Sequence, residues 1–576
     1  MSPIGSWTAV AGLAALALGA CAAGPRPQPG AGGGETPADP EATLRRFIAQ
    51  HVEKAAAIER QAALAYWKAT TTGDAEAYER VEALEVELRA LHADPEGYAL
   101  LERIAAAGAI EDPRLARQLA LLRNDFAANQ VPAELRRRMV KLSTRVQKTF
   151  SAFRGQLDGQ PVGDNAIKDI LRQSTDSARR RAAWEAYKAK GAAVRDDVLE
   201  LVRLRNQAAR RLGHADFYQM RLALSEQDPA RIQALFDELA RLTDAPFAAA
   251  MEKLRAELAE RYGVAPAALE PWHLGDPFFQ EPPRLRGVEL DPLFAEADPR
   301  QVVGRYFAGI GLDPGDILER SDLYEKKGKM PHAYCTHIDR SGDVRILANL
   351  QPDEQWTATL MHEMGHAVYD RYLDMELPWL LREPAHAFVT EAVAMLFGRQ
   401  TRNPVWLRKA LGAPDERVAA VEGDLARSQR LGMLVFARWA MVMMNFERQL
   451  YADPDQDLNA LWWKLKERYQ LVSAPQGRDA PDWASKIHIA VWPAYYHNYL
   501  LGELLASQLL ATLADRLGAA DPNQLALAGH PDVGAWLKSA VFAKGASLRW
   551  DALVEQATGQ PLDPRFFVEQ FVSRAD

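Results

Sequence analysis

Two histidines and a glutamate stand at a spacing that can hold and use a metal ion. Residues 362–366 read His-Glu-Met-Gly-His and fit the pattern HExxH. On a helix, residues four apart share one face, so His362 and His366 can bind one cation while Glu363 takes a proton from a water on it. Neutral imidazoles suit Zn²⁺, which in catalytic sites takes three protein ligands and leaves a position for water. The spacing predicts a zinc centre whose bound water is the nucleophile.

A third ligand is needed downstream. The acidic candidates are Asp370, Asp374, Glu376, Glu383 and Glu391. Asp370 and Asp374 would point away along the helix axis, and Glu383 precedes a proline in an expected loop. Glu391 is the single charge in an apolar helix expected over 387–398, where a carboxylate needs a strong partner. We expect that partner to be the cation; the alternative is a protonated or ion-paired core glutamate.

The elements around this motif are mostly helical. From Glu41 onward, Ala, Leu, Glu, Arg and Gln dominate, and apolar residues recur at helical spacing. Turn-forming residues at 70–74 predict a helix break, and Asp112-Pro113 and Val131-Pro132 predict helix starts. Residues 332–338 and 344–347 flank Asp-Arg-Ser-Gly, which predicts a β-hairpin just before the metal motif. No repeat is visible, so one large α-rich domain is expected.

Composition excludes several classes of protein. The 576 residues are 48% hydrophobic and 25% charged, which is typical of globular chains and not of disordered ones. A net charge of -8 argues against a nucleic-acid-binding protein, which needs a concentrated basic face. Two cysteines in this length exclude a disulfide scaffold.

The N-terminus has the features of an export signal. Residues 8–20 form an apolar run too short to span a bilayer, and Leu18-Gly19-Ala20-Cys21 resembles a lipoprotein processing site. The first seven residues contain no Lys or Arg, which departs from that pattern; ordinary secretion or a plain apolar tail are the alternatives. We expect a signal peptide at 1–20, lipidation at Cys21, a Pro- and Gly-rich tether over 21–40, and a body over 41–576.

This reading places the protein on a bacterial membrane, facing the periplasm and attached through its lipid alone. No later segment has 18 uninterrupted apolar residues, and the best candidate, 432–446, contains Arg438 and predicts a buried helix. With Cys21 lipidated, Cys335 has no partner within the chain.

Several further motifs resemble the peptidyl-dipeptidase A (angiotensin-converting enzyme) family of zinc peptidases. The HEMGH segment is followed at family spacing by Leu-Arg-Glu at 381–383 and by Glu-Ala at 391–392. Trp-Trp-Lys-Leu-Lys-Glu-Arg-Tyr-Gln at 462–470 resembles that family's WWxLRxxYQ. Leu274-Gly275 followed by Gln280 resembles its substrate-binding glutamine segment. Matches are scattered from about residue 184 to 499, so the resemblance covers most of the body.

The resemblance also implies roles for residues near the reacting bond. Lys486-Ile487-His488 and the later Tyr-His-Asn-Tyr at 496–499 resemble the family's K-x-H and Y-x-x-Y segment, with one extra residue between them. His488 and Tyr499 would then face the tetrahedral intermediate, where hydrogen-bond donors are needed. Lys486, Gln280 and Tyr496 would bind the C-terminal carboxylate of a substrate.

The segment before the metal motif fits the same resemblance. His332-Ala333 lies eleven residues before Asp343-Val344-Arg345-Ile346, as in the family's H-A…DFRI segment. We expect the edge of the hairpin at His332-Ala333 to pair with the substrate backbone as an added strand. Such pairing would hold a peptide without reading its side chains, which suits broad specificity.

The fold that follows is all-α, with a two-lobed helical bowl, a deep central cleft and a small β-sheet lining the active site. Helices over 41–125 are expected to form a lid that excludes folded proteins. The predicted function is hydrolysis of short peptides with a free C-terminus, releasing dipeptides, by a monomer with one zinc ion per chain. Two alternatives remain: a thimet-type oligopeptidase or carboxypeptidase, and a lipoprotein binding module without catalysis, against which the intact Glu363 argues.

Three departures from the family pattern matter. Met395 stands where the family has an Asp that supports the zinc site, so another residue must orient the imidazole. Arginines of the family's chloride sites are replaced by Lys188, Lys466 and Asn498. A lysine pair can still hold an anion, whereas a site with Asn498 lacks the cation, which puts chloride activation in doubt.

Overall fold

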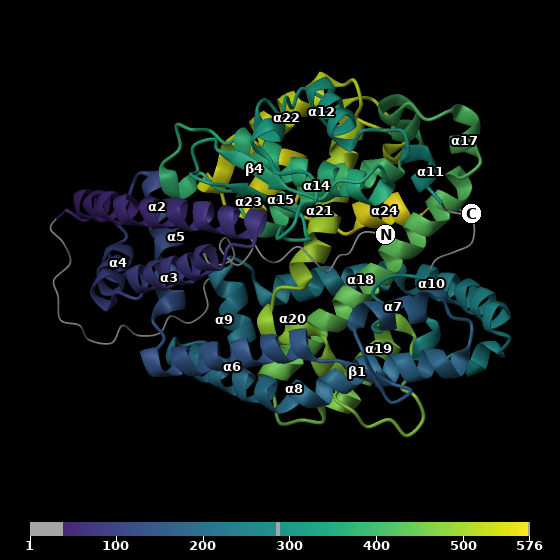
Figure 1. Ribbon diagram of the computed structural model, residues 1–576. Coiled ribbons are helices and arrows are strands. Elements are labelled where there is room, and N and C mark those ends of the chain that lie inside the picture. The colour runs from purple at the N-terminus through teal and green to yellow at the C-terminus, as the bar shows by residue number, and fades with distance from the viewer. Residues whose placement is uncertain (1–38, 284–288, 574–576) are drawn as a thin grey trace.

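The computed structural model describes residues 39–283 and 289–573 (Figure 1). Within them the fold is helical, with two small antiparallel hairpins, which confirms the all-α prediction with a small sheet. The predicted signal peptide, Cys21 and most of the tether lie outside the described residues. None of the helices in the described ranges is both long and apolar enough to cross a membrane.

Four helices at the N-terminal end form a separate layer (Figure 1). They are α2 (Pro40–Thr72), α3 (Ala75–His92), α4 (Pro95–Ala107) and α5 (Pro113–Asn129). The side chain of an Asp caps each of them by accepting backbone N–H groups of the first turn; these residues are Asp39, Asp74, Asp94 and Asp112. Gly73, in the left-handed region at φ 73°, ends α2 where the break was expected. Part of their apolar surface packs within the layer, in clusters separate from the main core.

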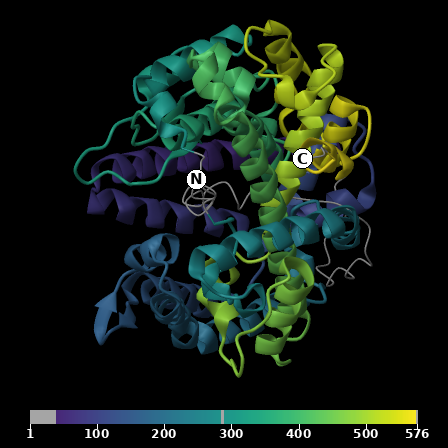
Figure 2. The same ribbon diagram turned by 90° about the vertical axis from the view of Figure 1, so that its right-hand side faces the viewer.

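The remaining helices fall into two groups, seen as lower and upper tiers in Figures 1 and 2. Elements of the lower part are α6 (Ala133–Ala152), β1 (Gly155–Leu157), β2 (Gln160–Val162), α7 (Asp164–Gln173), α8 (Ser177–Arg211), α9 (Phe217–Leu224), α10 (Pro229–Tyr262), α19 (Leu458–Gln470) and α20 (Ile487–Val491). The β1–β2 hairpin lies in a stretch that was expected to be helical throughout, so that expectation was wrong. Asp158 (φ 53°) and Gly159 (φ 76°) form its turn, as a two-residue turn with two positive φ angles requires.

The upper part holds the metal motif. Its elements are α11 (Asp291–Phe294), α12 (Pro299–Gly309), α13 (Ile317–Arg320), β3 (Tyr334–His337), β4 (Val344–Leu347), α14 (Glu354–Arg371), α15 (Ala387–Gly398), α16 (Pro404–Trp406), α17 (Asp415–Ala419), α22 (Pro531–Ala540), α23 (Trp550–Thr558) and α24 (Arg565–Phe571). Short 3₁₀ turns are η1 (Pro266–Ala268), η2 (Pro271–His273), η3 (Trp379–Leu381), η4 (Arg399–Arg402), η6 (Asp482–Ser485), η7 (Pro522–Gln524) and η8 (Phe542–Ser547), and η5 (Leu407–Leu411) is a π-turn.

Two long helices join the tiers. α18 (Glu422–Ala452) and α21 (His497–Arg516) run from one group toward the other (Figures 1 and 2), and one large apolar core extends through both groups. α18 contains the segment 432–446 that was expected to be a buried helix, and Arg438 inside it donates to Asp244. The upper and lower groups of helices are therefore held together by a shared apolar core rather than by a flexible linker.

The helices α14, α15 and α21 pack closely around the metal motif. A Cβ atom built on Gly365 of α14 would lie 2.7 Å from the Cα of Ala394 on α15, so only glycine allows this approach. On α21, a Cβ at Gly502 would lie 3.3 Å from the Cβ of Glu391. The predicted hairpin is present as β3 and β4, paired in the register Tyr334 opposite Leu347, and it packs beside α14. These contacts fix the relative position of the residues considered next.

Candidate metal centre and active site

The three predicted metal ligands meet at one point. His362 and His366 lie one turn apart on α14, and Glu391 projects from α15, with one ligand atom of each within 4.8 Å of the others. The two Nε2 atoms are 3.2 Å apart, and Glu391 Oε2 is 3.6 Å from Nε2 of His362 and 3.9 Å from that of His366. Two imidazoles and a carboxylate are the donor set of many catalytic zinc sites. The donor chemistry and spacing therefore fit a single zinc ion.

Burial keeps the ligands in the form that binds a cation or needs one. It lowers the pKa of His366 to about 4 and that of His362 well below its ordinary value, so both imidazoles are neutral and can ligate. Burial also raises the pKa of Glu391 to about 7. An ionised Glu391 thus needs a positive partner, and a cation bound between the three residues would supply it.

A neighbour on α15 orients one of the ligands. His366 Nδ1 lies 2.7 Å from the hydroxyl of Thr390, the residue just before Glu391. This contact can fix which ring nitrogen faces the metal, the task that the family's Asp performs and that Met395 cannot. Thr390 could not be predicted from the sequence, because its role depends on the close approach of α14 and α15.

Glu363 is placed as a proton acceptor would be. Its side chain is 1% exposed, and neither carboxylate oxygen has a hydrogen-bond partner within the described part of the chain. Burial, followed by the nearby charge of Glu391, raises its pKa well above the ordinary value. A carboxylate of raised basicity beside a metal centre can take a proton from water and return it to a leaving group.

Gln280 and Lys486, more than two hundred residues apart in the chain, meet directly. Lys486 Nζ donates to Gln280 Oε1 over 2.6 Å. Asp276 shapes the loop that carries Gln280 by accepting from the backbone N–H groups of Phe278 (2.7 Å) and Gln280 (2.9 Å). Burial lowers the pKa of Lys486 to about 8. An amide and an ammonium group together form a suitable receptor for a carboxylate.

The other predicted residues form a ring cluster next to this pair. The Tyr496 ring is 5.2 Å from that of His488 and 5.3 Å from that of Tyr499, and it lies 5.3 Å from Lys486 Nζ. Trp439 Nε1 donates to the Tyr496 hydroxyl over 2.7 Å, which leaves that hydroxyl's own proton for another acceptor. His488 is buried, and its Nδ1 has no partner among the described residues. The polar atoms of Tyr496 and His488 thus lie among buried aromatic rings.

A cavity of about 260 Å³ adjoins the metal centre. Its walls include Glu363, His366 and Glu391, hairpin residues 334–340, and residues 382–384. Asp370 also lines this cavity, and it is not one of the clustered ligand residues. His332 is exposed and Ala333 buried; they precede the strand instead of forming its edge. The strand β3, with the partly buried free thiol of Cys335, borders the cavity.

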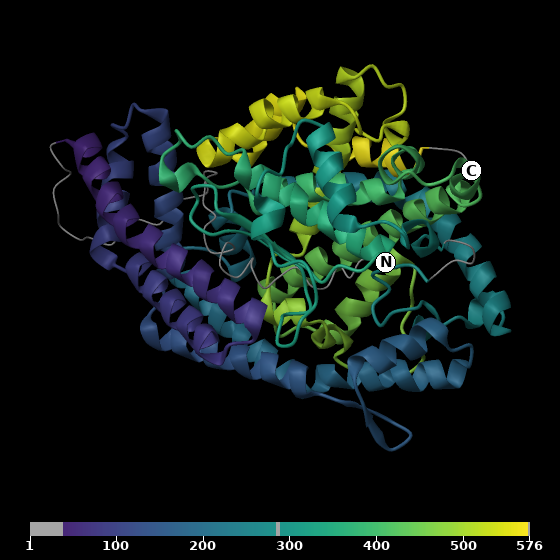
Figure 3. The same ribbon diagram turned by 45° about the horizontal axis from the view of Figure 1, so that its top comes forward.

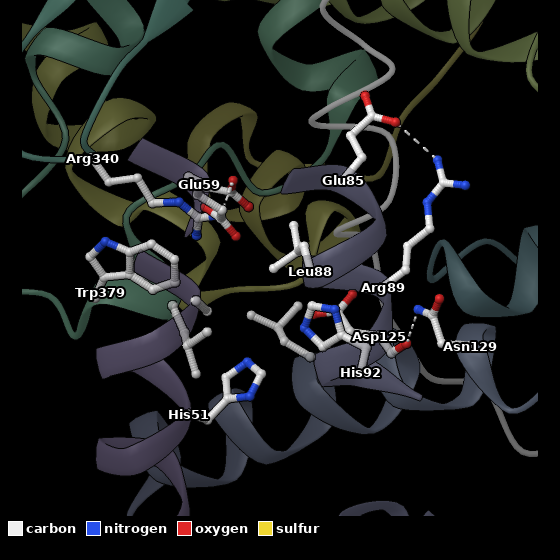
Figure 4. Close-up of a pocket in the computed structure, with 14 residues that line it drawn as sticks. His51, Glu59, Glu85, Leu88, Arg89, His92, Asp125, Asn129, Arg340 and Trp379 are labelled. Atoms are coloured by element: carbon white, nitrogen blue, oxygen red, sulfur yellow. Dashed lines mark hydrogen bonds and ion pairs between the residues drawn. The ribbon is translucent and has the colours of Figure 1, made fainter. Parts of the chain in front are cut away.

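A partly buried charge cluster joins the N-terminal helices to this cavity (Figure 4). The Arg340 guanidinium contacts Glu59 of α2 at 2.7 Å and Glu383, before α15, at 2.8 Å, and lies 4.0 Å above the Trp379 ring. Asp125 of α5 lies nearby, and burial raises the pKa of its carboxyl well above the ordinary value. Sequence reasoning missed this cluster because its members come from four separate segments.

The lysines and the asparagine at the altered positions already have partners. Lys466 Nζ donates to the Phe278 carbonyl over 2.8 Å and to Gln470 Oε1 over 2.5 Å, and Lys188 Nζ reaches Ser485 Oγ at 3.4 Å. A cavity between the two lysines has a volume of about 10 Å³. Asn498 accepts from Gln227 over 2.6 Å. Neutral protein groups thus contact each of these side chains.

Comparisons with known proteins bear on the whole chain. The family model described as angiotensin-converting enzyme, peptidase M2, matches residues 38–274 and 304–572. Among relatives, the mouse angiotensin-converting enzyme is 25% identical over 288 residues, 47% of this chain and 21% of its own length. An angiotensin-converting enzyme-related protein of Drosophila melanogaster is 23% identical over 475 residues, 73% of this chain and 72% of its own. Carboxypeptidase 1 of Bacillus subtilis is 24% identical over 260 residues, 41% of this chain and 51% of its own.

The extent of these matches decides what they show. The matched region corresponds to only about a fifth of the mouse and rat angiotensin-converting enzymes, so their activities as whole proteins do not transfer. The family model, in contrast, covers most of this chain on both sides of residues 275–303. The matched regions contain the metal motif, Glu391 and the ring cluster. The chain therefore belongs to the angiotensin-converting enzyme family of metallopeptidases, peptidase M2.

Proposed function

We propose that the protein is a zinc-dependent peptidyl-dipeptidase that removes dipeptides from the C-terminus of short peptides. One observation carries the proposal: the His362–His366–Glu391 cluster and the Lys486–Gln280 pair occur in the same fold. The first can hold a hydrolytic metal ion, and the second can bind a chain end. An enzyme that has both cuts near a free carboxylate rather than within a chain.

His362, His366 and Glu391 would hold the zinc, with Thr390 fixing the ring of His366. A zinc ion held there would supply a Lewis acid and a water of lowered pKa. Glu363, unpartnered and buried, accepts the proton of the attacking water and returns it to the departing amine. The close packing of α14 against α15 supports this proposal, because groups held by a rigid framework need little reorganisation during the reaction.

His488 and Tyr499 would stabilise the negative charge that develops on the scissile carbonyl oxygen. Both are buried, and their rings lie 5.2 and 5.3 Å from that of Tyr496. Burial lowers the pKa of His488 well below its usual value and raises that of Tyr499 well above, so both are neutral donors at physiological pH. Neutral donors in a dry site stabilise a new oxyanion more than they stabilise the uncharged substrate.

Lys486, Gln280 and Tyr496 would bind the terminal carboxylate, which sets the number of residues beyond the cut. In this proposal two residues of the substrate lie between the scissile bond and this receptor. The edge of the hairpin near His332-Ala333 would guide the backbone, and β3 borders the cavity where such pairing can occur. The helices α2 to α5 would act as the lid over residues 41–125, admitting flexible peptides and excluding folded proteins.

Product identification tests this function directly. The protein is loaded with zinc, its metal content is measured, and it is given an N-terminally blocked tripeptide with a free C-terminus. We expect about one zinc per chain and release of a dipeptide. The same peptide with an amidated C-terminus is the control and should react far more slowly. Release of a single residue would identify a carboxypeptidase. Zinc-dependent cleavage that persists on the amidated peptide would point to an oligopeptidase.

A carboxypeptidase is the second candidate, favoured by the Bacillus relative of that name. It would use the same metal cluster and the same Lys486–Gln280 pair with one residue beyond the cut. A binding module without catalysis would show neither zinc nor product. The tripeptide experiment separates all three.

We also propose that the protein is exported and lipid-anchored through Cys21, with 1–20 as the signal peptide and 21–40 as the tether. The support is the sequence alone: an apolar run that ends at Leu-Gly-Ala-Cys. Labelling of cells with a radioactive fatty acid should mark the protein, and Cys21→Ala should abolish the label and release the protein from the membrane fraction. A label that persists in the variant would contradict the proposal.

A further inference from the structure

Asp370 has a position that the proposed mechanism does not use. It lies one turn after His366 on α14 and lines the cavity of about 260 Å³ beside Glu363. Its carboxylate makes no hydrogen bond or ion pair with any residue of the described ranges. A partly buried carboxylate without a partner at the edge of a metal centre is costly to keep ionised. A positively charged ligand bound in the cavity would stabilise the ionised carboxylate of Asp370.

The other charges on the cavity wall are largely engaged. Arg340 is shared by Glu59 and Glu383. Arg382 Nε donates to the Leu377 carbonyl over 2.8 Å. Arg60 lines the cavity from α2, with an exposed side chain. The wall thus offers one buried cation already paired with two carboxylates, while Asp370 has none.

The charged groups around the cavity favour a positively charged ligand. Burial, followed by the charge of Glu383, raises the pKa of Asp370 to about 7. Glu363, 1% exposed and with both oxygens unpartnered, faces the same cavity. A positive group of a ligand would stabilise the ionised carboxylate here more strongly than at the surface, because little water screens the pair.

The cavity leads to further acidic groups. A smaller cavity of about 50 Å³ shares Glu59, Arg340 and Glu383 with it, and Figure 4 shows its walls. Asp125 on α5 lines the far side, and its carboxylate also lacks a hydrogen bond or ion pair among the described residues. A long, flexible cationic side chain entering past Asp370 would meet carboxylates along its path.

The position of the cavity indicates which part of a peptide enters it. The receptor for the terminal carboxylate, Lys486 with Gln280, contributes nothing to the wall of this cavity, whereas the metal cluster does. A peptide held by its C-terminus at Lys486 and crossing the metal centre would place residues before the scissile bond in the cavity. Resting on the proposed function, we propose that Asp370 determines specificity by binding a Lys or Arg side chain on the amino-terminal side of the cut.

Paired substrates test the inference. Acetylated tetrapeptides ending in Ala-Ala carry lysine, norleucine or glutamate at either of the two positions before the expected cut, and kcat/KM is measured for each. Lysine should exceed its neutral isostere norleucine by about tenfold or more at one position, as a charge-assisted contact in a shielded site allows. In Asp370→Asn this ratio should fall to about one. Glu376→Gln, an exposed carboxylate beyond the same helix, should keep the wild-type ratio.

The ratio separates the possible results, since a general loss of fold or zinc affects both peptides equally. Equal rates for lysine and norleucine in the wild type, a preference for glutamate through Arg60, or a lysine preference that survives in Asp370→Asn would each overturn the inference. Absence of any Ala-Ala product from all peptides would instead refute the proposed function.

Discussion

At the scale of single residues, the metal centre combines two kinds of buried carboxylate. Glu391 faces two neutral imidazoles and requires a cation, whereas Glu363 has no partner for either oxygen within the described chain. The difference supports the proposed roles of Glu391 as the metal ligand and Glu363 as the proton acceptor. Both groups are buried carboxyls of raised pKa, so their roles follow from what surrounds them and not from their own chemistry.

Glu363→Gln should separate metal binding from catalysis. The amide keeps the size of the side chain and cannot accept the proton of the attacking water. We expect kcat to fall by about 10²–10⁴-fold while the zinc content stays near one per chain. The matched control is Glu376→Gln, which lies outside the cavity and should retain activity. A Glu363→Gln variant with full activity would refute the proposed mechanism.

Lys486 should give the pH profile its alkaline limb. Burial lowers the pKa of this amine to about 8, so the charged form that binds a carboxylate is lost as the pH rises through about 8. The value of kcat/KM for peptides with a free C-terminus should therefore fall above this pH, mainly through KM. In Lys486→Arg, whose guanidinium stays charged, the limb should disappear. An unchanged limb in this variant would assign the titration to another group.

Single residues also show where sequence reasoning stops. His362, His366 and Glu391 could be predicted because helical spacing and a lone charge in an apolar helix are local signals. The pairing of Gln280 with Lys486 was accessible only through the family resemblance, since the two are joined by the fold alone. Thr390 carried no sequence signal, and Asp370 was considered only as a metal ligand, because a hydroxyl contact or a cavity wall depends on how α14 meets its neighbours.

At the scale of elements, the geometry of the site depends on how closely α14 approaches α15. The ligands sit on two helices whose separation is limited by Gly365 and Ala394. The hairpin β3–β4 was predictable from its turn residues and alternating pattern. The hairpin β1–β2 was missed despite its Asp-Gly turn, because strands of three residues are too short for a pattern to outweigh the helical sequence around them.

Gly365→Ala should disturb the metal site through this packing. The new methyl group would lie 2.7 Å from the Cα of Ala394, a backbone atom that cannot move alone. We expect a loss of about 1–3 kcal/mol in the free energy of unfolding and weaker zinc binding. Gly432→Ala in the interior of α18 is the matched control: a Cβ there meets nothing within 4 Å, so helix propensity should stabilise the protein by about 0.5–1 kcal/mol. Equal stability of the two variants would contradict the packing argument.

At the scale of the whole molecule, we expect the lower group of helices not to bind an activating chloride ion, in contrast to the pattern its family suggests. Lys188 on α8 and Lys466 on α19 are bound by protein acceptors, and the space between them, about 10 Å³, barely holds a water molecule. Replacing chloride by acetate at constant ionic strength should leave kcat/KM unchanged within about twofold, since long-range screening is held fixed. Strong activation that saturates with chloride would show that the pocket opens.

The N-terminal layer is coupled to the rest of the molecule through Arg340. The N-terminal helices lie in purple and dark blue at the left of Figure 3, and the Arg340 guanidinium joins α2 to Glu383, which precedes α15 (Figure 4). Because α15 carries Glu391, this ionic contact links the N-terminal layer to the helix of one predicted metal ligand. The contact brings two partly buried carboxylates to a single cation, with Asp125 close by. The stabilisation that the ionic contacts of Arg340 provide must therefore depend on how many of these carboxylates are ionised.

Arg340→Gln should destabilise the protein in a pH-dependent way. Even beside Arg340, burial raises the pKa of Glu383 to about 7, above the value of about 4.3 expected in the unfolded chain. A carboxyl with a raised folded pKa lowers stability increasingly as the pH rises from the unfolded to the folded value, and loss of the cation enlarges this effect. Thermal or urea unfolding should show that the free energy of unfolding falls only slightly at pH 5 and by about 2 kcal/mol at pH 8. This loss is smaller than that for breaking a fully buried pair, because Glu59 and Glu383 are 25% and 27% exposed. The control is Arg60→Gln, which removes the same charge from the exposed face of α2 and should change neither the stability nor its pH dependence. A loss of stability in Arg340→Gln that does not depend on pH would mean that the stacking of Arg340 on Trp379 matters more than its charge.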